Sequence, residues 1–389
     1  MPKNINVLTS LRFFAALAVI FEHTRHFFTF TDPLKTDIPM AISVTFFFVL
    51  SGFILTYVYQ DIEKSGKKFD FYAARIARAW PLHIATLLLA FFLLPLDKTL
   101  FHQPHYIATT LLNASLLHAW VPYSTVFFSY NSVSWAMSVE LFFYIIFPFL
   151  GANWSRKWLL KSSLMLLFLI LYLCFMTYVY IHNRNIDLTG ITSVIPFSRL
   201  GEFVGGMIAA QIFINLNKKH ISGGIILWSI IELITVIIAY YYAANIVNFS
   251  AWVAKHTISE VLVMYTVTSG TAPMFMALMM VFAFQKGIIT KILSKDLFVF
   301  LGELSFALYL THNILILFLV EHKANLALFS DPILFLFYSI ALFLVSYVLW
   351  EYVQKPTRKI IYVYLQTRVK ENLTALFKKR YKNIPEPNF

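Results

Sequence analysis

The chain has 389 residues, of which 59% are hydrophobic and only 13% are charged. Soluble domains contain about 45–50% apolar and about 25% charged residues, so this composition excludes an ordinary soluble globular protein. The single cysteine, Cys174, excludes a disulfide framework and a cysteine-based metal site. The net charge of +12 does not indicate nucleic-acid binding, because the positions of the basic residues fit membrane topology instead.

A membrane-spanning helix needs about 20 mostly apolar residues to cross a hydrocarbon core about 30 Å thick. Apolar runs of this length recur along the whole chain, and they predict an all-α membrane protein with ten transmembrane helices. The expected spans are residues 7–29, 39–60, 79–97, 132–151, 158–182, 196–216, 222–244, 261–285, 297–320 and 332–354. Residues 104–120 are apolar but short, and we expect them to form an interfacial or re-entrant helix.

The connections between these spans differ in charge. Most of the 31 Lys and Arg residues fall in the terminal segments and in every second connection, which the positive-inside rule assigns to the cytoplasm. Both termini are therefore predicted to be cytoplasmic. We expect residues 1–355 to form the transmembrane domain and residues 356–389 to form a basic cytoplasmic tail, whose charges favour anionic lipid headgroups.

The first expected span contains three ionisable residues, Arg12, Glu22 and His23. Ionisable groups inside a membrane are costly, which makes them functional candidates. Arg12 and His23 are three helical turns apart, so they share roughly one face at a separation of about 16 Å. This stripe predicts a polar cavity. Alternatively, Arg12 reaches to the lipid phosphates and His23 caps the outer interface.

Two further features have a chemical interpretation. Arg75 and Arg78 are spaced i, i+3 and lie on one helix face, an arrangement suited to binding phosphates. Their alternative role is membrane anchoring. Glu140 lies about two turns into the fourth span, where a carboxylate can orient the His23 imidazole and stabilise its charged form, or can pair with an arginine.

The later spans carry polar residues with structural interpretations. Arg199 and Glu202 are spaced i, i+3 and are expected to form an intrahelical ion pair, with cavity lining as the second interpretation. Tyr309 and His312 lie near one face of the ninth span. We expect them to serve packing and cavity lining rather than chemistry.

In order and at the right spans, these features resemble the membrane-bound acyltransferase-3 family. The resemblance covers nearly the whole chain. It rests on Leu11-Arg12-Phe13 with His23, Phe46-Phe47-Phe48-Val49-Leu50-Ser51-Gly52-Phe53, Arg75 with Arg78, Ser134-Trp135 with Ser138-Val139-Glu140, Arg199-Leu200-Gly201-Glu202-Phe203, and Leu301-Gly302-Glu303-Leu304-Ser305-Phe306 with Tyr309 and His312.

The resemblance implies a stand-alone enzyme in the bacterial cytoplasmic membrane that moves an acyl group, expected to be acetyl, from cytoplasmic acyl-CoA. The implied acceptor is a hydroxyl of a carbohydrate or lipid-linked glycan on the outer side, such as lipopolysaccharide or exopolysaccharide. Acyl-CoA is the donor substrate, and no permanently bound cofactor, metal or nucleic acid is expected. The implied roles are His23 as the catalytic histidine, Glu140 as a required acidic residue, Arg12 as a required arginine, and Arg75 with Arg78 as the acyl-CoA-binding pair. From the chemistry we further expect His23 to act as a general base and Arg12 to contribute to acyl-CoA binding as a deeper positive charge.

Several alternatives stay open at this point. Direct transfer and an acyl-histidine intermediate are both compatible with His23. Secondary site candidates are Glu22, Trp135, Ser138, Arg199, Glu202, Tyr309 and His312. A glycolipid or polysaccharide transporter or flippase that uses Arg12, His23 and Glu140 as a polar relay is the alternative function, and a sensor or assembly subunit is a further one.

Overall fold

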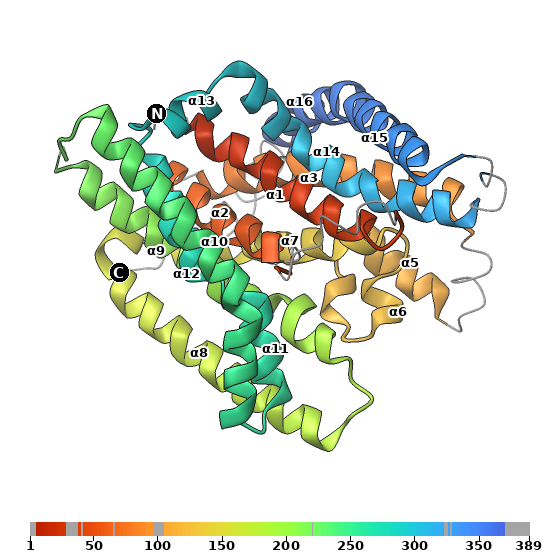
Figure 1. Cartoon of the computed structure of the whole chain (residues 1–389), viewed down its shortest axis with the longest axis horizontal. Coiled ribbons are helices and arrows are strands. Elements are labelled where there is room, and N and C mark those ends of the chain that lie inside the picture. Colours follow the sequence, from red (N-terminus) through yellow and green to blue (C-terminus); the bar gives the residue numbers. More distant parts are fainter. Residues whose placement is uncertain are drawn as a thin grey trace, which may run out of the picture.

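Helices make up all the regular structure that the computed structural model describes, which covers residues 5–28, 38–39, 42–64, 67–95, 105–219, 221–322, 326 and 329–369. The predicted all-α class is therefore confirmed for these residues. Figure 1 shows the long helices packed side by side, with α1 (Asn6–Thr24) running through the middle of the bundle. Residues 370–389 of the predicted basic tail lie outside the described residues.

The remaining helices follow α1 in chain order. The long ones and those packed directly against them are α2 (Ser43–Val58), α3 (Lys67–Leu93), α7 (Trp135–Gly151), α8 (Trp154–His182), α9 (Leu200–Asn217), α10 (Ile225–His256), α11 (Glu260–Ser269), α12 (Ala272–Ala283), α14 (Asp296–Glu321) and α15 (Asp331–Val348). The shorter ones are α5 (Tyr106–Ala114), α6 (Ser124–Phe127), α13 (Ile288–Leu293) and α16 (Lys355–Tyr364), with single helical turns at His118–Trp120, Ser132–Ser134, Gly190–Val194, Pro196–Arg199, Leu349–Gln354 and Leu365–Val369.

Nine helical segments in the described part of the chain are long and apolar enough to cross a membrane. They coincide with nine of the ten predicted spans. The other predicted span, residues 39–60, corresponds to α2, which is equally apolar but has 16 residues. A multi-pass membrane protein is thus supported, whereas the exact count of ten and the orientation of the termini stay predictions.

Helix α3 differs from the prediction in its start. It begins at Lys67 rather than near residue 79, so Arg75 and Arg78 belong to the spanning helix itself. Pro81 therefore lies inside the helix and not in its first turn. The apolar window begins only after the arginines, and hydropathy alone consequently places the start of the helix too late.

The predicted short helix within residues 104–120 is present as α5, followed by the turn at His118–Trp120. Its polar residues face the protein, because Asn113 and His118 are fully buried. The Asn113 side chain donates to the carbonyl oxygen of Ser129, and the His83 ring of α3 contacts the carbonyl oxygen of Asn113 at 2.9 Å. These contacts attach the short helix to the bundle.

Glycines allow two pairs of helices to approach very closely. A Cβ atom added at Gly52 of α2 would lie 1.9 Å from the carbonyl oxygen of Phe203, and one added at Gly206 of α9 would lie 1.9 Å from that of Val49. Gly302 of α14 packs in the same way against the backbone of α1. Small residues permit such backbone contact in membrane helices, and the three positions fix α1, α2, α9 and α14 relative to one another.

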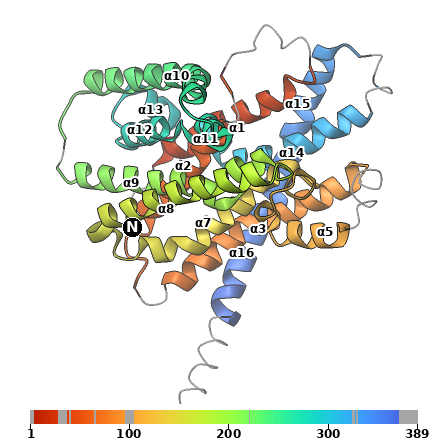
Figure 2. The same ribbon diagram turned by 90° about the horizontal axis from the view of Figure 1, so that it is seen from below.

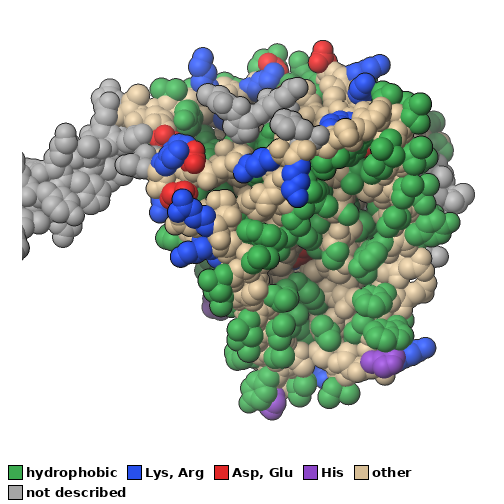
Figure 3. Space-filling model, turned by 90° about the vertical axis from the view of Figure 1, so that its left-hand side faces the viewer, with side chains coloured by type: hydrophobic (Ala, Val, Ile, Leu, Met, Phe, Trp, Pro, Cys, Tyr) green, Lys and Arg blue, Asp and Glu red, His purple; other side chains and the backbone are tan. Residues whose placement is uncertain are grey.

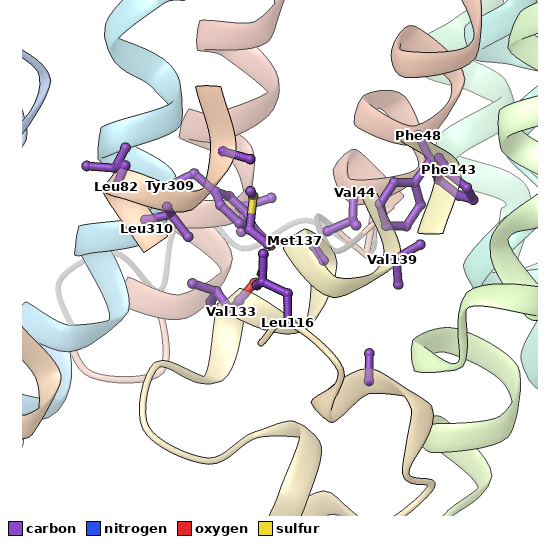
Figure 4. Close-up of a cluster of buried hydrophobic side chains, with 14 of the residues drawn as sticks. Val44, Phe48, Leu82, Leu116, Val133, Met137, Val139, Phe143, Tyr309 and Leu310 are labelled. Carbon is purple, nitrogen blue, oxygen red and sulfur yellow. Dashed lines mark hydrogen bonds between the residues drawn. The ribbon is translucent and has the colours of Figure 1, made fainter. Parts of the chain in front are cut away.

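The outer surface suits a lipid environment. Figure 3 shows hydrophobic side chains over most of one face, with Lys and Arg gathered mainly towards one end. Inside the bundle, apolar side chains from α2, α7 and α14 form the cluster in Figure 4, where Val44, Met137 and Tyr309 lie together. This cluster is the region around which the polar residues are arranged.

Candidate active site

The first cavity gathers the predicted donor-binding arginines. It encloses about 1040 Å³ of space between α1, α2, α3, α7 and α14. Arg12 of α1 and Arg75 and Arg78 of α3 line it together with Glu140 of α7. Residues far apart in sequence, and singled out separately from the sequence, are thus brought to one site.

The arginines of this cavity have few protein partners. Arg75 donates from Nη2 to the Tyr59 hydroxyl at 3.1 Å, while its buried Nε has no hydrogen-bond partner among the residues that the structure describes. In the described part of the chain, Arg12 and Arg78 make neither a hydrogen bond nor an ion pair. Three like charges around one cavity repel each other, so the site is arranged to receive negative charge.

Aromatic rings surround the guanidinium group of Arg75. The Arg75 carbon Cζ lies 5.5 Å from the ring centroid of Tyr59 and 5.8 Å from those of Phe71 and Tyr144. Such cation–π contacts stabilise a charged side chain without neutralising it. Arg75 is therefore held in place with its charge still available to a ligand.

Glu140 belongs to the arginine cavity and not to His23. Its Oε1 accepts from the hydroxyls of Ser51 and Tyr144, and it interacts electrostatically with Arg12 and Arg75 without forming an ion pair in the described residues. Of the two partners considered for Glu140, the structure favours the arginines over the His23 imidazole, because α7 turns the carboxylate towards α2 and α3. Glu140 instead offsets part of the arginine charge.

The second cavity contains His23. It encloses about 1210 Å³ and is walled by α1, α7, α11 and the segments around α2 and α9. Its polar lining includes the side chains of Ser132, Thr189, Ser193 and Thr268. Trp135 contributes an aromatic wall. Hydroxyls beside an aromatic surface make a lining that suits a neutral, hydroxylated ligand.

The partner of His23 is Asn313 of α14. Nδ1 of His23 lies 3.2 Å from Oδ1 of Asn313, whose Nδ2 donates to the Ser132 hydroxyl at 2.8 Å. Because Oδ1 can only accept, Nδ1 carries the ring proton and Nε2 keeps its lone pair. The His312 ring lies next to this pair, with ring centroids 5.0 Å apart, and its Nδ1 contacts the carbonyl oxygen of Tyr309.

The other charged candidates are paired. Glu22 lines the second cavity and accepts from Arg25 at 2.7 Å, with His26 at 3.7 Å. Arg199 forms the predicted ion pair with Glu202 at 2.6 Å, and both side chains are buried. Arg199 also reaches the second cavity, so both interpretations given to it from the sequence apply.

The two further candidates Ser138 and Tyr309 are uncharged, and of the two only Tyr309 lines the cavities. Ser138 is buried and donates to the carbonyl oxygen of Leu116, so it holds α7 to the preceding loop. Tyr309 lines both cavities, as does Val44. The Tyr309 hydroxyl donates to the carbonyl oxygen of Val133 at 3.1 Å, and Figure 4 shows Tyr309 beside Leu310 and Met137 in the buried cluster. Tyr309 therefore stands at the junction of the two cavities.

Sequence reasoning missed four contributors: Ser51, Tyr59, Tyr144 and Asn313. Only Asn313 gave a usable signal, since an asparagine directly after His312 in an apolar helix needs hydrogen-bond partners. The tyrosines are ordinary in a chain with 21 of them. In the described residues, no group of three His, Cys, Asp or Glu side chains is placed to hold a metal ion.

Comparison with known proteins decides the family. A family model described as an acyltransferase domain matches residues 5–351. The chain belongs to this acyltransferase family. The resemblance found in the sequence motifs is thereby confirmed over nearly the whole chain.

Individual relatives match over shorter stretches. The chain is 32% identical over 148 residues to "Acyltransferase MdmB" of Streptomyces mycarofaciens, covering 36% of this chain and 38% of that protein. It is 31% identical over 166 residues to "Nodulation protein 10" of Rhizobium leguminosarum bv. viciae, covering 38% and 44%. The matches thus span less than half of each relative's length. No solved structure shows significant similarity.

Proposed function

We propose that the protein is a multi-pass membrane acyltransferase that moves an acyl group, expected to be acetyl, from cytoplasmic acyl-CoA to a hydroxyl of a carbohydrate or lipid-linked glycan on the outer side. The observation that carries the proposal is the pair of cavities, one lined by three arginines and one by His23, which share Val44 and Tyr309. The family and a relative named as an acyltransferase support the reaction class.

The first cavity is the proposed donor site. Acyl-CoA is a polyanion because of its phosphates, and arginine binds phosphate through paired N–H donors. Arg12, Arg75 and Arg78 supply such donors without competing ion pairs in the described residues. The apolar lining towards Val44 and Tyr309 suits the less polar arm that carries the thioester.

His23 is the proposed general base. Its Nε2 accepts the proton of the acceptor hydroxyl as the oxygen attacks the thioester carbonyl carbon, a role worth about 10²–10⁴-fold in rate. The new C–O bond forms, the C–S bond breaks, and the imidazolium returns the proton to the CoA thiolate. Asn313 stabilises the imidazolium through Nδ1–H. An acyl-histidine intermediate would use the same nitrogen.

The second cavity is the proposed acceptor site. Its hydroxyl groups match the hydrogen-bonding edges of a sugar, and Trp135 offers an aromatic surface for the sugar's apolar face. Among the described residues, the Asp, Glu, Lys and Arg side chains that line the cavity are Glu22 and Arg199, and both form ion pairs. We therefore propose a neutral acceptor hydroxyl rather than an ionic one.

The test measures transfer of the acyl label and release of the CoA thiol in the same sample. Membranes containing the protein are supplied with acyl-labelled acyl-CoA, and release of free CoA thiol is measured alongside label in the glycan fraction. Acyl transfer predicts equal amounts of both, dependent on the protein. Movement of glycan or glycolipid across the membrane without thioester consumption would establish a transporter or flippase instead.

A further inference from the structure

A groove outside both cavities lies between α3 and α16. It encloses about 520 Å³ and is lined by two alanines of α3 and four residues of α16, namely Ala74, Ala77, Lys355, Arg358, Lys359 and Tyr362. None of these residues lines either cavity. The proposed function does not use them.

The groove lies at the end of an unusually long helical segment. The helix from Asp331 to Thr367 has 37 residues, which corresponds to about 55 Å, well beyond a hydrocarbon core of about 30 Å. Its basic final part therefore projects past the apolar region on the side predicted to be cytoplasmic. Figure 2 shows α16 extending beyond the bundle next to α3, and Gln366 donates to Asp70 of α3 at 2.7 Å.

The groove and the proposed donor cavity are both lined by α3 and lie on different faces of that helix. Ala74 and Ala77 immediately precede Arg75 and Arg78, so α3 presents its arginines to the cavity and its small side chains to the groove. The charge of Arg358 interacts with those of Arg78 and Arg75. A single polyanion can therefore contact both places.

The cations of the groove differ in how they are paired. Lys355 forms an ion pair with Glu351 at 2.7 Å and lies over the Trp350 ring. Within the described ranges, Arg358 and Lys359 make no ion pair, and both are exposed. Two unpaired cations beside an exposed tyrosine ring suit a ligand that combines phosphate with a flat base.

We propose that the groove binds the 3′-phosphorylated adenosine nucleotide of acyl-CoA, with Arg358 and Lys359 on its phosphates and Tyr362 against the adenine ring. The small side chains of Ala74 and Ala77 leave space for the base. This inference rests on the proposed function, which places the rest of the donor in the neighbouring cavity. Lipid headgroups share the phosphate chemistry but lack the base and the 3′-phosphate.

The test compares two donors that differ only in the nucleotide. Purified protein in nanodiscs of neutral lipid is titrated with acetyl-CoA and with acetyl-phosphopantetheine. Replacing Arg358→Gln together with Lys359→Gln is expected to weaken acetyl-CoA binding by about tenfold or more, since charge-assisted hydrogen bonds are lost. Binding of acetyl-phosphopantetheine is expected to stay unchanged. Tyr362→Ala is expected to act in the same selective way.

The control replaces Arg156→Gln with Lys157→Gln, two exposed cations of α8 that lie outside the groove. Equal weakening of both donors, or no weakening, would overturn the groove assignment while leaving acyl-CoA binding intact. An effect that occurs only in nanodiscs of anionic lipid would also overturn it and assign the groove to headgroups. If wild-type protein binds neither donor, the proposed function itself fails.

Discussion

The two cavities differ in whether their charged side chains have hydrogen-bonding or ionic partners in the protein. In the first, Arg12 and Arg78 have no hydrogen-bonding or ionic partner in the described residues, and Arg75 has one hydroxyl. In the second, Arg199 is paired with Glu202 and His23 with the neutral side chain of Asn313. Uncompensated charge is costly in a membrane, so its concentration at one end indicates an anionic ligand there. The paired, neutral lining of the other cavity indicates an uncharged one.

The largest effect that separates the two cavities is expected for His23→Ala. Loss of the base is expected to lower kcat for acyl transfer by about 10²–10⁴-fold, with acyl-CoA affinity unchanged because the arginines are intact. Transfer is measured with labelled acyl-CoA, and affinity by titration. His182→Ala, which removes an exposed histidine of α8, serves as the control. Transfer at the wild-type rate would remove His23 from the mechanism.

The next largest effect, on acyl-CoA affinity, is expected in the cavity lined by the arginines. Arg75→Gln with Arg78→Gln removes two charged donors, each worth about 1.5–3 kcal/mol, so the Kd for acyl-CoA should rise by about a hundredfold or more. The control variant is Arg156→Gln with Lys157→Gln. Thermal stability is monitored in parallel. Unchanged affinity in a folded variant would return these arginines to a purely membrane-anchoring role.

A smaller effect is expected from the residue that positions His23. Asn313→Ala should lower kcat by about tenfold, because misplacement of a reacting group by about 1 Å costs up to about 10²-fold. The KM for acyl-CoA should be unchanged. Asn313→Asp keeps an acceptor for Nδ1–H and is expected to recover most of the rate while altering its pH dependence. Equal losses in both variants would indicate that Asn313 only supports packing.

The smallest effect on chemistry, but a clear one on stability, is expected at the contact between α2 and α9. Gly206→Ala places a Cβ 1.9 Å from the carbonyl oxygen of Val49, and overpacking of this kind costs about 1–3 kcal/mol. Thermal unfolding in detergent measures it. Gly224→Ala is the control, since nothing lies within 4 Å of its added Cβ. Because α2 lines both cavities, Gly206→Ala should reduce donor and acceptor functions together.

Much of this arrangement could be predicted from the sequence. Apolar length located the helices, and the i, i+3 spacing of Arg75 and Arg78 placed both on one face, where the structure has them. The depth of a residue along its span was a less informative guide to its neighbours. It left open whether Glu140 meets His23 or an arginine, and the rotation of α7 places Glu140 with the arginines. Which neighbour a helix face meets depends on long-range packing, including the contacts at Gly52 and Gly206, and periodicity does not encode it.

The position of Val44 and Tyr309, which line both cavities, also bears on the membrane potential. Where the donor and acceptor cavities are reached from opposite sides of the membrane, as we propose, part of the transmembrane voltage falls across the layer of side chains that the two cavities share. A charge that crosses it changes energy by about 2.3 kcal/mol per 100 mV. In the proposed reaction the hydroxyl, the thioester, the ester and the thiol are all uncharged, so the proton delivered to the thiolate balances the acyl group that left it and no net charge crosses. Acyl transfer by the proposed route is therefore expected to proceed at the same equilibrium in an energised and in a de-energised membrane.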